Sequence, residues 1–157
     1  RLYKCTWQVG DVYAYRLESE YSKEKGLYGK YIIFQKVGET DCWPGHIIPI
    51  VVVYRWIGAE IPRMEELRKL EFLNQIRPVS LMGRTQEECY HRELVCESEK
   101  KIPVTQLILL GNQKPREKTV LKKGRCNCMG WEKTKINWTI EKETIDLYLA
   151  WQEHDNA

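Results

Sequence analysis

The sequence lacks the motifs that identify common catalytic sites. It has no glycine-rich phosphate loop, no G-x-S-x-G nucleophile elbow, no H-E-x-x-H zinc helix and no paired aspartate motif. Long apolar runs are also missing: the longest, Ile47 to Tyr54, contains Pro49 and is far shorter than the roughly 20 residues that cross a bilayer. These absences disfavour an enzyme of a common class and a membrane-spanning helix.

Charge of one sign is scarce as well. The formal net charge of +3 is small for a duplex-DNA binder, which concentrates far more positive charge on one face. Phenylalanine is equally scarce, with two Phe against six Trp and nine Tyr. Such amphipathic rings suit half-buried sheets and protein contact surfaces, where one edge packs and the other hydrogen-bonds.

The length and composition of the chain fit one globular domain. A chain of 157 residues that is 43% hydrophobic and 30% charged can bury a core without metal or disulfide staples. The six cysteines match no disulfide framework that we can name, so we expect reduced thiols and a cytoplasmic protein.

Three strands are predicted in the first sixty residues. After a turn at Gly10-Asp11, residues 12–17 alternate, with Val12, Ala14 and Arg16 on one face and Tyr13, Tyr15 and Leu17 on the other. Residues 18–29 predict a loop or short helical turn. A second strand covers 30–37 and closes at Gly38-Glu39, residues 41–45 form a connection, and a third strand covers 46–56 and ends at Gly58. The third strand is nearly all apolar, so we place it centrally, with a bulge or an edge at Pro49.

The rest of the chain predicts a mixture of helix and strand. Pro62, followed by Glu65 and Glu66, predicts a middle helix with an apolar stripe up to Arg77-Pro78. Residues 79–101 have no clear pattern, and residues 104–110 predict a buried strand stopped by Gly111-Asn112. Residues 139–154 predict an amphipathic helix, with an apolar face formed by Ile140, Thr144, Leu147, Tyr148 and Trp151.

We therefore predict an α+β fold. It has a mainly antiparallel curved sheet or partly open small β-barrel, a middle helix and a C-terminal amphipathic helix. The whole chain, 1–157, is expected to be a single domain, with a β-rich part (1–58), a mixed part (59–125) and a C-terminal helical segment (137–154).

Cysteine and histidine offer the main chemical alternatives. Cys126 and Cys128 could share a zinc ion with Cys89 and His91, but C-x-x-C pairs are missing and we favour small buried thiols, with no metal and no other cofactor. His46 or His91 could centre a hydrolase or nuclease. A general base needs an orienting partner and a pocket, so we favour structural roles for both.

A basic stretch at residues 114–125 is the candidate nucleic-acid site. Its cations include Lys118, Lys122, Lys123 and Arg125, and it contains no aromatic residue for base stacking. A solvated hairpin is the favoured interpretation, and a nucleic-acid-associated module is the alternative.

Three segments carry a resemblance to known sequences. Residues 7–17 (WQVGDVYAYRL), 29–37 (GKYIIFQKV) and 43–51 (WPGHIIPIV) resemble uncharacterised proteins of Firmicutes and their mobile elements. More distantly, the opening is similar to small-barrel immunity proteins that neutralise polymorphic bacterial toxins. The resemblance implies binding to a partner protein and carries no catalytic residues.

The leading hypothesis is a non-catalytic bacterial protein of immunity type that inhibits a partner, such as a toxin or effector, by surface contact. Exposed aromatic residues are the usual anchors of such contacts. We predict Trp43, Tyr54 and Trp56 as partner-binding residues, because they flank turns where rings can stay accessible.

Overall fold

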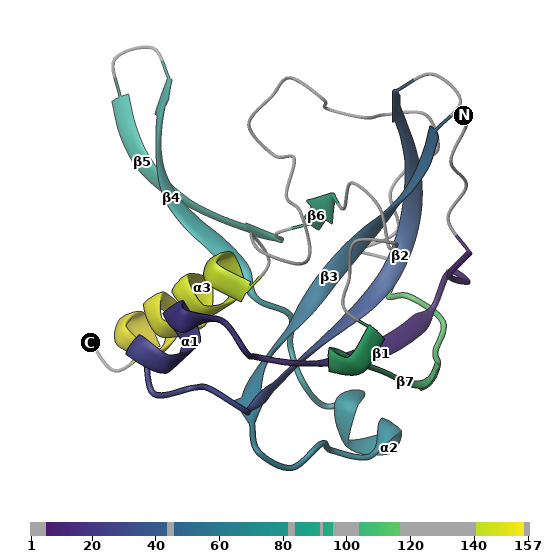
Figure 1. Ribbon diagram of the computed structural model, residues 1–157. Coiled ribbons are helices and arrows are strands. Elements are labelled where there is room, and N and C mark those ends of the chain that lie inside the picture. Colours follow the sequence, from purple (N-terminus) through teal and green to yellow (C-terminus); the bar gives the residue numbers. More distant parts are fainter. Residues whose placement is uncertain are drawn as a thin grey trace.

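The computed structural model of the chain describes residues 6–43, 46–81, 84–91, 93–95, 104–116 and 141–155. Its main element is an antiparallel sheet in the strand order β6-β3-β2-β1-β7 (Figure 1). The five strands are β1 (Asp11–Arg16), β2 (Tyr31–Trp43), β3 (His46–Gly58), β6 (Glu93–Val95) and β7 (Leu107–Asn112). In the described part of the chain β6 and β7 do not pair, so the sheet is open, and the predicted α+β fold is confirmed.

The remaining elements lie around this sheet. Strands β4 (Asn74–Leu81) and β5 (Arg84–His91) form a separate hairpin that projects away from it (Figure 1). The helices are α1 (Glu20–Glu24), α2 (Met64–Leu67) and α3 (Glu141–Asp155). None of the helices in the described ranges is long and apolar enough to cross a membrane.

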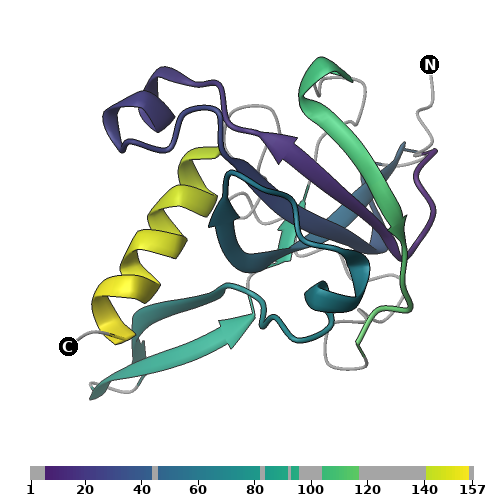
Figure 2. The same cartoon turned by 90° about the horizontal axis from the view of Figure 1, so that it is seen from below.

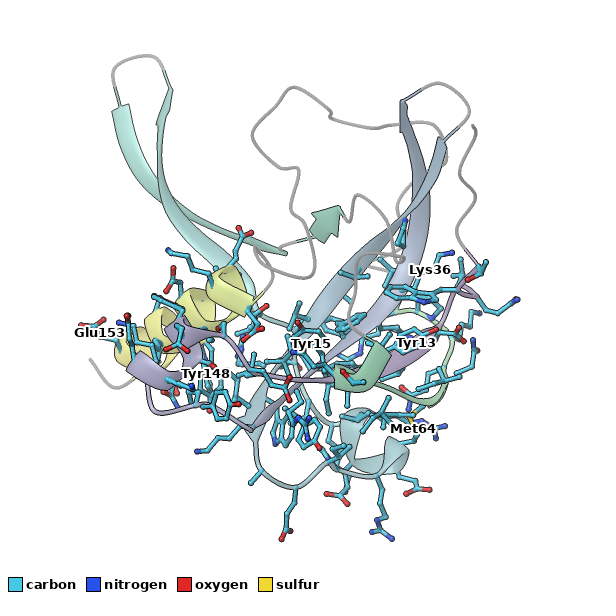
Figure 3. All side chains as sticks on the ribbon, in the orientation of Figure 1. Tyr13, Tyr15, Lys36, Met64, Tyr148 and Glu153 are labelled. Atoms are coloured by element: carbon cyan, nitrogen blue, oxygen red, sulfur yellow. The ribbon has the colours of Figure 1, made fainter. Side chains whose placement is uncertain are left out.

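Strand β1 is buried on both of its faces. The alternation predicted from the sequence is confirmed, because Tyr13 and Tyr15 belong to one hydrophobic cluster and Val12 and Ala14 to another. Core A consists of Tyr13, Tyr15, Leu17, Ile32, Phe34, Val51, Val53, Leu73 and Ile145. Core B consists of Val12, Ala14, Ile33, Val37, Val52, Tyr54, Leu67 and Phe72. Figure 3 shows Tyr13 and Tyr15 on one side of β1 and Met64, which packs against core B, on the other.

Helices cover the two faces of the sheet. Ile145 of α3 is fully buried in core A, and α3 lies beside α1 (Figure 2). The C-terminal helix is therefore confirmed, and Thr144, Leu147, Tyr148 and Trp151 of its predicted apolar face are buried or pack against core A. The fifth predicted member of that face, Ile140, lies outside the described residues.

The predicted end of the second strand was wrong. β2 does not close at Gly38-Glu39 but continues to Trp43, which pairs with His46 across the tip of a long hairpin. The pairing register shifts between Lys36 and Gly38, so the glycine is accommodated by an irregularity instead of ending the strand. Because β3 is equally long, Gly38, Glu39, Thr40 and Trp43 of the extended β2 all pair in register with residues of β3.

A middle helix is present, but it ends much earlier than the predicted limit at Arg77-Pro78. α2 is a single turn, and residues 71–73 instead pair with β3: Leu73 donates its amide to the carbonyl of Val53 at 2.8 Å, and Phe72 forms a bridge with Tyr54. The leucines at helical spacing do not line one helix face, since Leu67 is buried in core B and Leu73 in core A. Burial in two cores overrode the local periodicity.

The predicted buried strand at residues 104–110 was partly wrong. Residues Val104–Gln106 form a 3₁₀ turn, and β7 begins at Leu107 and includes Gly111 and Asn112, which were expected to stop it. Among the described residues β7 pairs with β1 only, and it forms an edge of the sheet. It is therefore not buried on both sides.

Candidate functional site

The outer edge of β7 exposes large apolar side chains. Leu109 is 57% exposed and Ile108 is 42% exposed, the two highest values among the aliphatic side chains of the sheet strands that can be described. The two side chains point to opposite faces, because successive residues of a strand alternate. Both faces of the edge are therefore apolar, and we call the strand together with these two side chains the β7 edge.

The position of β7 explains this exposure. Leu109 lies opposite Tyr13 and Ile108 lies opposite Ala14 of β1, so each inner side is covered by a core residue. In the described part of the chain no strand lies on the other side of β7. Figure 2 shows β7 at one side of the molecule and α3 at the opposite side.

A backbone edge of this kind is chemically competent to bind an extended chain. In an antiparallel pair only alternate residues turn their amide and carbonyl groups toward the neighbouring strand, so the other groups of β7 point outward. Natural proteins usually protect such edges with lysine, proline or a very short strand. The exposed centre of β7 carries isoleucine and leucine instead.

The chain turns from β7 over core B and forms a second feature there. Residues 112–116 and the end of α2 enclose an open pocket of about 370 Å³ on the core B face of the sheet. Its lining consists of Gln35, Tyr54, Arg68, Asn112, Gln113, Lys114 and Arg116. We call it the basic pocket, because three of these residues are cationic.

Two side chains hold the 112–116 segment in place. Gln35, which is buried in β2, donates from Nε2 to the carbonyl of Gln113 at 2.8 Å. The guanidinium of Arg116 lies 4.4 Å from the ring centre of Phe72 and donates from Nη2 to the carbonyl of Leu70 at 2.5 Å. The pocket walls are therefore fixed to the sheet and to the end of α2 by direct hydrogen bonds.

The aromatic residues predicted to bind a partner differ in their burial and position. Tyr54 is only 1% exposed and its ring packs on Phe72, so the expectation of an accessible ring there was wrong. Burial raises the pKa of the Tyr54 phenol, an effect that the nearby Arg116 partly offsets. Trp56 is half-buried and packs against core B. Trp43 ends β2 beside His46, and the side chains of both lie outside the described set.

The predicted zinc ligands are brought together only in part. Cys89 and His91 both belong to β5, where their backbones pair in register with Ile76 and Asn74 of β4. Cys126 and Cys128 lie outside the described residues, as do Lys118, Lys122, Lys123 and Arg125 of the alternative nucleic-acid site. Within the described ranges no cluster of three or more His, Cys, Asp or Glu side chains could hold a metal ion.

Sequence reasoning missed both the β7 edge and the basic pocket. A short apolar run such as Leu107–Leu110 gives the same pattern in a central strand and in an edge strand, so the sequence alone contained no signal for its exposure. The pocket had a signal, since Lys114 and Arg116 begin the basic stretch. Their partner Arg68 comes from a segment that was predicted to be mid-helix.

No family model, no curated protein and no solved structure matches this sequence. The resemblance to small-barrel immunity proteins therefore stays a prediction.

Proposed function

We propose that this protein is a non-catalytic protein-binding module that takes up an extended segment of its partner along the β7 edge. The observation that carries the proposal is the pair of exposed side chains, Leu109 at 57% and Ile108 at 42%, on a strand whose sole partner within the described ranges is β1. Strand addition to an open sheet edge is a common mode of peptide recognition.

The binding mode divides affinity and specificity between two kinds of group. The outward amide and carbonyl groups of β7 supply main-chain hydrogen bonds, which any extended chain can make. Ile108 and Leu109 select apolar side chains at neighbouring positions of the partner, one on each face. A partner strand that covers both side chains removes apolar surface from water at roughly 25 cal/mol per Å².

The partner that we propose is a toxin or effector, as expected for an immunity-type inhibitor. The support is the open edge together with the absence of a common catalytic motif from the sequence. An inhibitor of this type acts by occupying its target, so it needs a surface and no reacting group.

The test compares two surface variants with the wild-type protein. Leu109→Lys places a charge on the edge, and Tyr28→Ser changes a side chain of similar exposure, 51%, in the turn before β2. Candidate partners are the products of the neighbouring genes, each co-expressed with the three proteins. We expect Leu109→Lys to abolish binding and toxin rescue, and Tyr28→Ser to retain both.

Amide hydrogen exchange places the contact on the molecule. On binding, amides of residues 107–112 should become protected, whereas those of the α1 turn should not change. A partner that binds Leu109→Lys as tightly as the wild type contradicts the proposal. So does a wild-type protein that forms a dimer through β7, because its edge is then occupied by a second copy.

A further inference from the structure

The basic pocket gathers positive charge from two separate parts of the chain. Arg68 follows α2, whereas Lys114 and Arg116 follow β7, more than forty residues later. No carboxylate is among the seven lining residues. Arg68 and Lys114 are both exposed, and neither forms an ion pair with an acidic side chain in the part of the chain that the structure describes.

The nearest acidic group on β1 is already engaged. Asp11 accepts a hydrogen bond from Nδ2 of Asn112 at 3.0 Å and another from the amide of Gln8 at 2.9 Å. This carboxylate therefore fixes the Asn112 wall of the pocket without belonging to its lining.

The uncharged walls are polar and held in position. Gln113 donates from its side chain to the carbonyl of Met64 at 2.9 Å, and its own carbonyl accepts from Gln35. These bonds join α2, β2 and the segment after β7 around one space. A site with fixed walls binds without the cost of ordering them first.

We propose that the basic pocket binds the phosphate group of a small organic molecule. Phosphate offers oxygen acceptors and close to two negative charges at neutral pH, which suits a site with several cationic donors better than a single carboxylate does. The volume of about 370 Å³ lies within the range of small-molecule sites and exceeds the space that inorganic phosphate alone would fill. The organic part of the ligand therefore has room inside the pocket.

Calorimetric titration of the whole chain tests the proposal with three probes. These are inorganic phosphate, adenosine monophosphate and adenosine, and the third shares the organic part without the phosphate. We expect adenosine monophosphate to bind more tightly than inorganic phosphate, and adenosine to show no binding. Binding of adenosine as tight as that of its monophosphate, or no binding of either phosphate at millimolar concentration, overturns the proposal.

Charge-neutralising variants locate the site. Arg68→Gln and Lys114→Gln should each weaken phosphate binding by about tenfold or more, since tenfold is the lower end for one hydrogen bond to a charged group. Lys69→Gln is the matched control, because Lys69 is an exposed neighbour of Arg68 that does not line the pocket. An equal loss in Lys69→Gln means general charge attraction and contradicts the site.

The proposals for the basic pocket and for the β7 edge can be tested independently. Leu109→Lys should leave phosphate binding unchanged, since Leu109 is outside the pocket lining. If phosphate binding is lost in this variant, the pocket is not the separate site proposed here.

Discussion

The carboxylate of Glu141, the first residue of α3, lies 3.3 Å from the phenol oxygen of Tyr15 in β1, and both side chains are almost fully buried. The other carboxylate oxygen accepts the backbone amide of Ser19 at 3.2 Å. Burial and the Glu141 charge raise the pKa of the Tyr15 phenol, which therefore stays a hydrogen-bond donor. One carboxylate thus links α3 to β1 and to the start of α1.

Removing this carboxylate should destabilise the protein. Glu141→Ala leaves the buried Tyr15 hydroxyl and the Ser19 amide without this acceptor, which costs about 1–3 kcal/mol of unfolding free energy. Urea unfolding measures the loss, and Glu153→Gln on the exposed part of α3 is the control. A double-mutant cycle with Tyr15→Phe should give a coupling energy of about 0.5 kcal/mol or more. Additive effects would contradict the link.

Gly10 and Gly26 form a matched pair for testing close backbone approach. Both have positive φ, 98° and 71°, but a Cβ on Gly10 would lie 2.5 Å from the carbonyl oxygen of Gln113, whereas one on Gly26 would meet nothing within 4 Å. Gly26→Ala should cost about 1 kcal/mol from the backbone conformation alone. Gly10→Ala should cost clearly more, because the segment after β7 must move. Equal thermal shifts in the two variants would refute the close approach.

Arg116→Lys should behave as a disruptive substitution. The guanidinium of Arg116 stacks on Phe72 and reaches the carbonyls of Leu67 and Leu70, a combination that a lysine ammonium cannot reproduce. We expect a loss of about 1–3 kcal/mol in urea unfolding. Lys69→Gln, the same control as for the pocket, should change stability by less than about 0.5 kcal/mol. Unchanged stability of Arg116→Lys would show that this anchor is dispensable.

The contact between Tyr21 and Asp146 should make stability depend on pH in the acid range. Burial raises the pKa of Asp146, but hydrogen bonds from the Tyr21 hydroxyl and the Lys142 ammonium outweigh it, so the net pKa is below the ordinary value of 3.8. A lowered pKa in the folded state contributes stability above pH 3.8, which is lost as the pH falls through the folded-state pKa.

The variant Asp146→Asn isolates this contribution. At neutral pH it should be less stable than the wild type, and the difference should disappear as the pH is lowered below 3.8. Urea unfolding of both proteins across the acid range measures it. A difference that stays constant with pH would assign the effect to packing instead of charge.

The sequence predicted the fold correctly where the local pattern of apolar residues matches the way the segment is buried. Residues 11–16 alternate because both faces of β1 are buried, and residues 141–155 keep a helical stripe because one face of α3 meets core A. In both cases local propensity and tertiary packing agree.

The prediction for the middle of the chain failed because leucines at helical spacing are buried in two different cores. Leucine recurs every third residue at 67, 70 and 73, as in a helix, yet Leu67 and Leu73 enter opposite cores, and residues 71–73 pair with β3. Long-range pairing of this kind leaves no trace in a short window of sequence. The candidate sites share that origin: the β7 edge depends on which strand lies last in the sheet, and the basic pocket joins Arg68 to Lys114.

The pairing of β7 with β1 also has a consequence for synthesis. Asp11 pairs with Asn112, roughly a hundred residues later, whereas the same strand meets β2 after a much shorter connection that contains α1. On the ribosome the β1–β2 hairpin is therefore complete long before β7 emerges, and for that interval β1 itself is the open edge of the sheet. Until then the backbone groups of β1 that later bind β7 are exposed in the nascent protein, and pairing of another chain with them is the hazard that this topology creates for assembly.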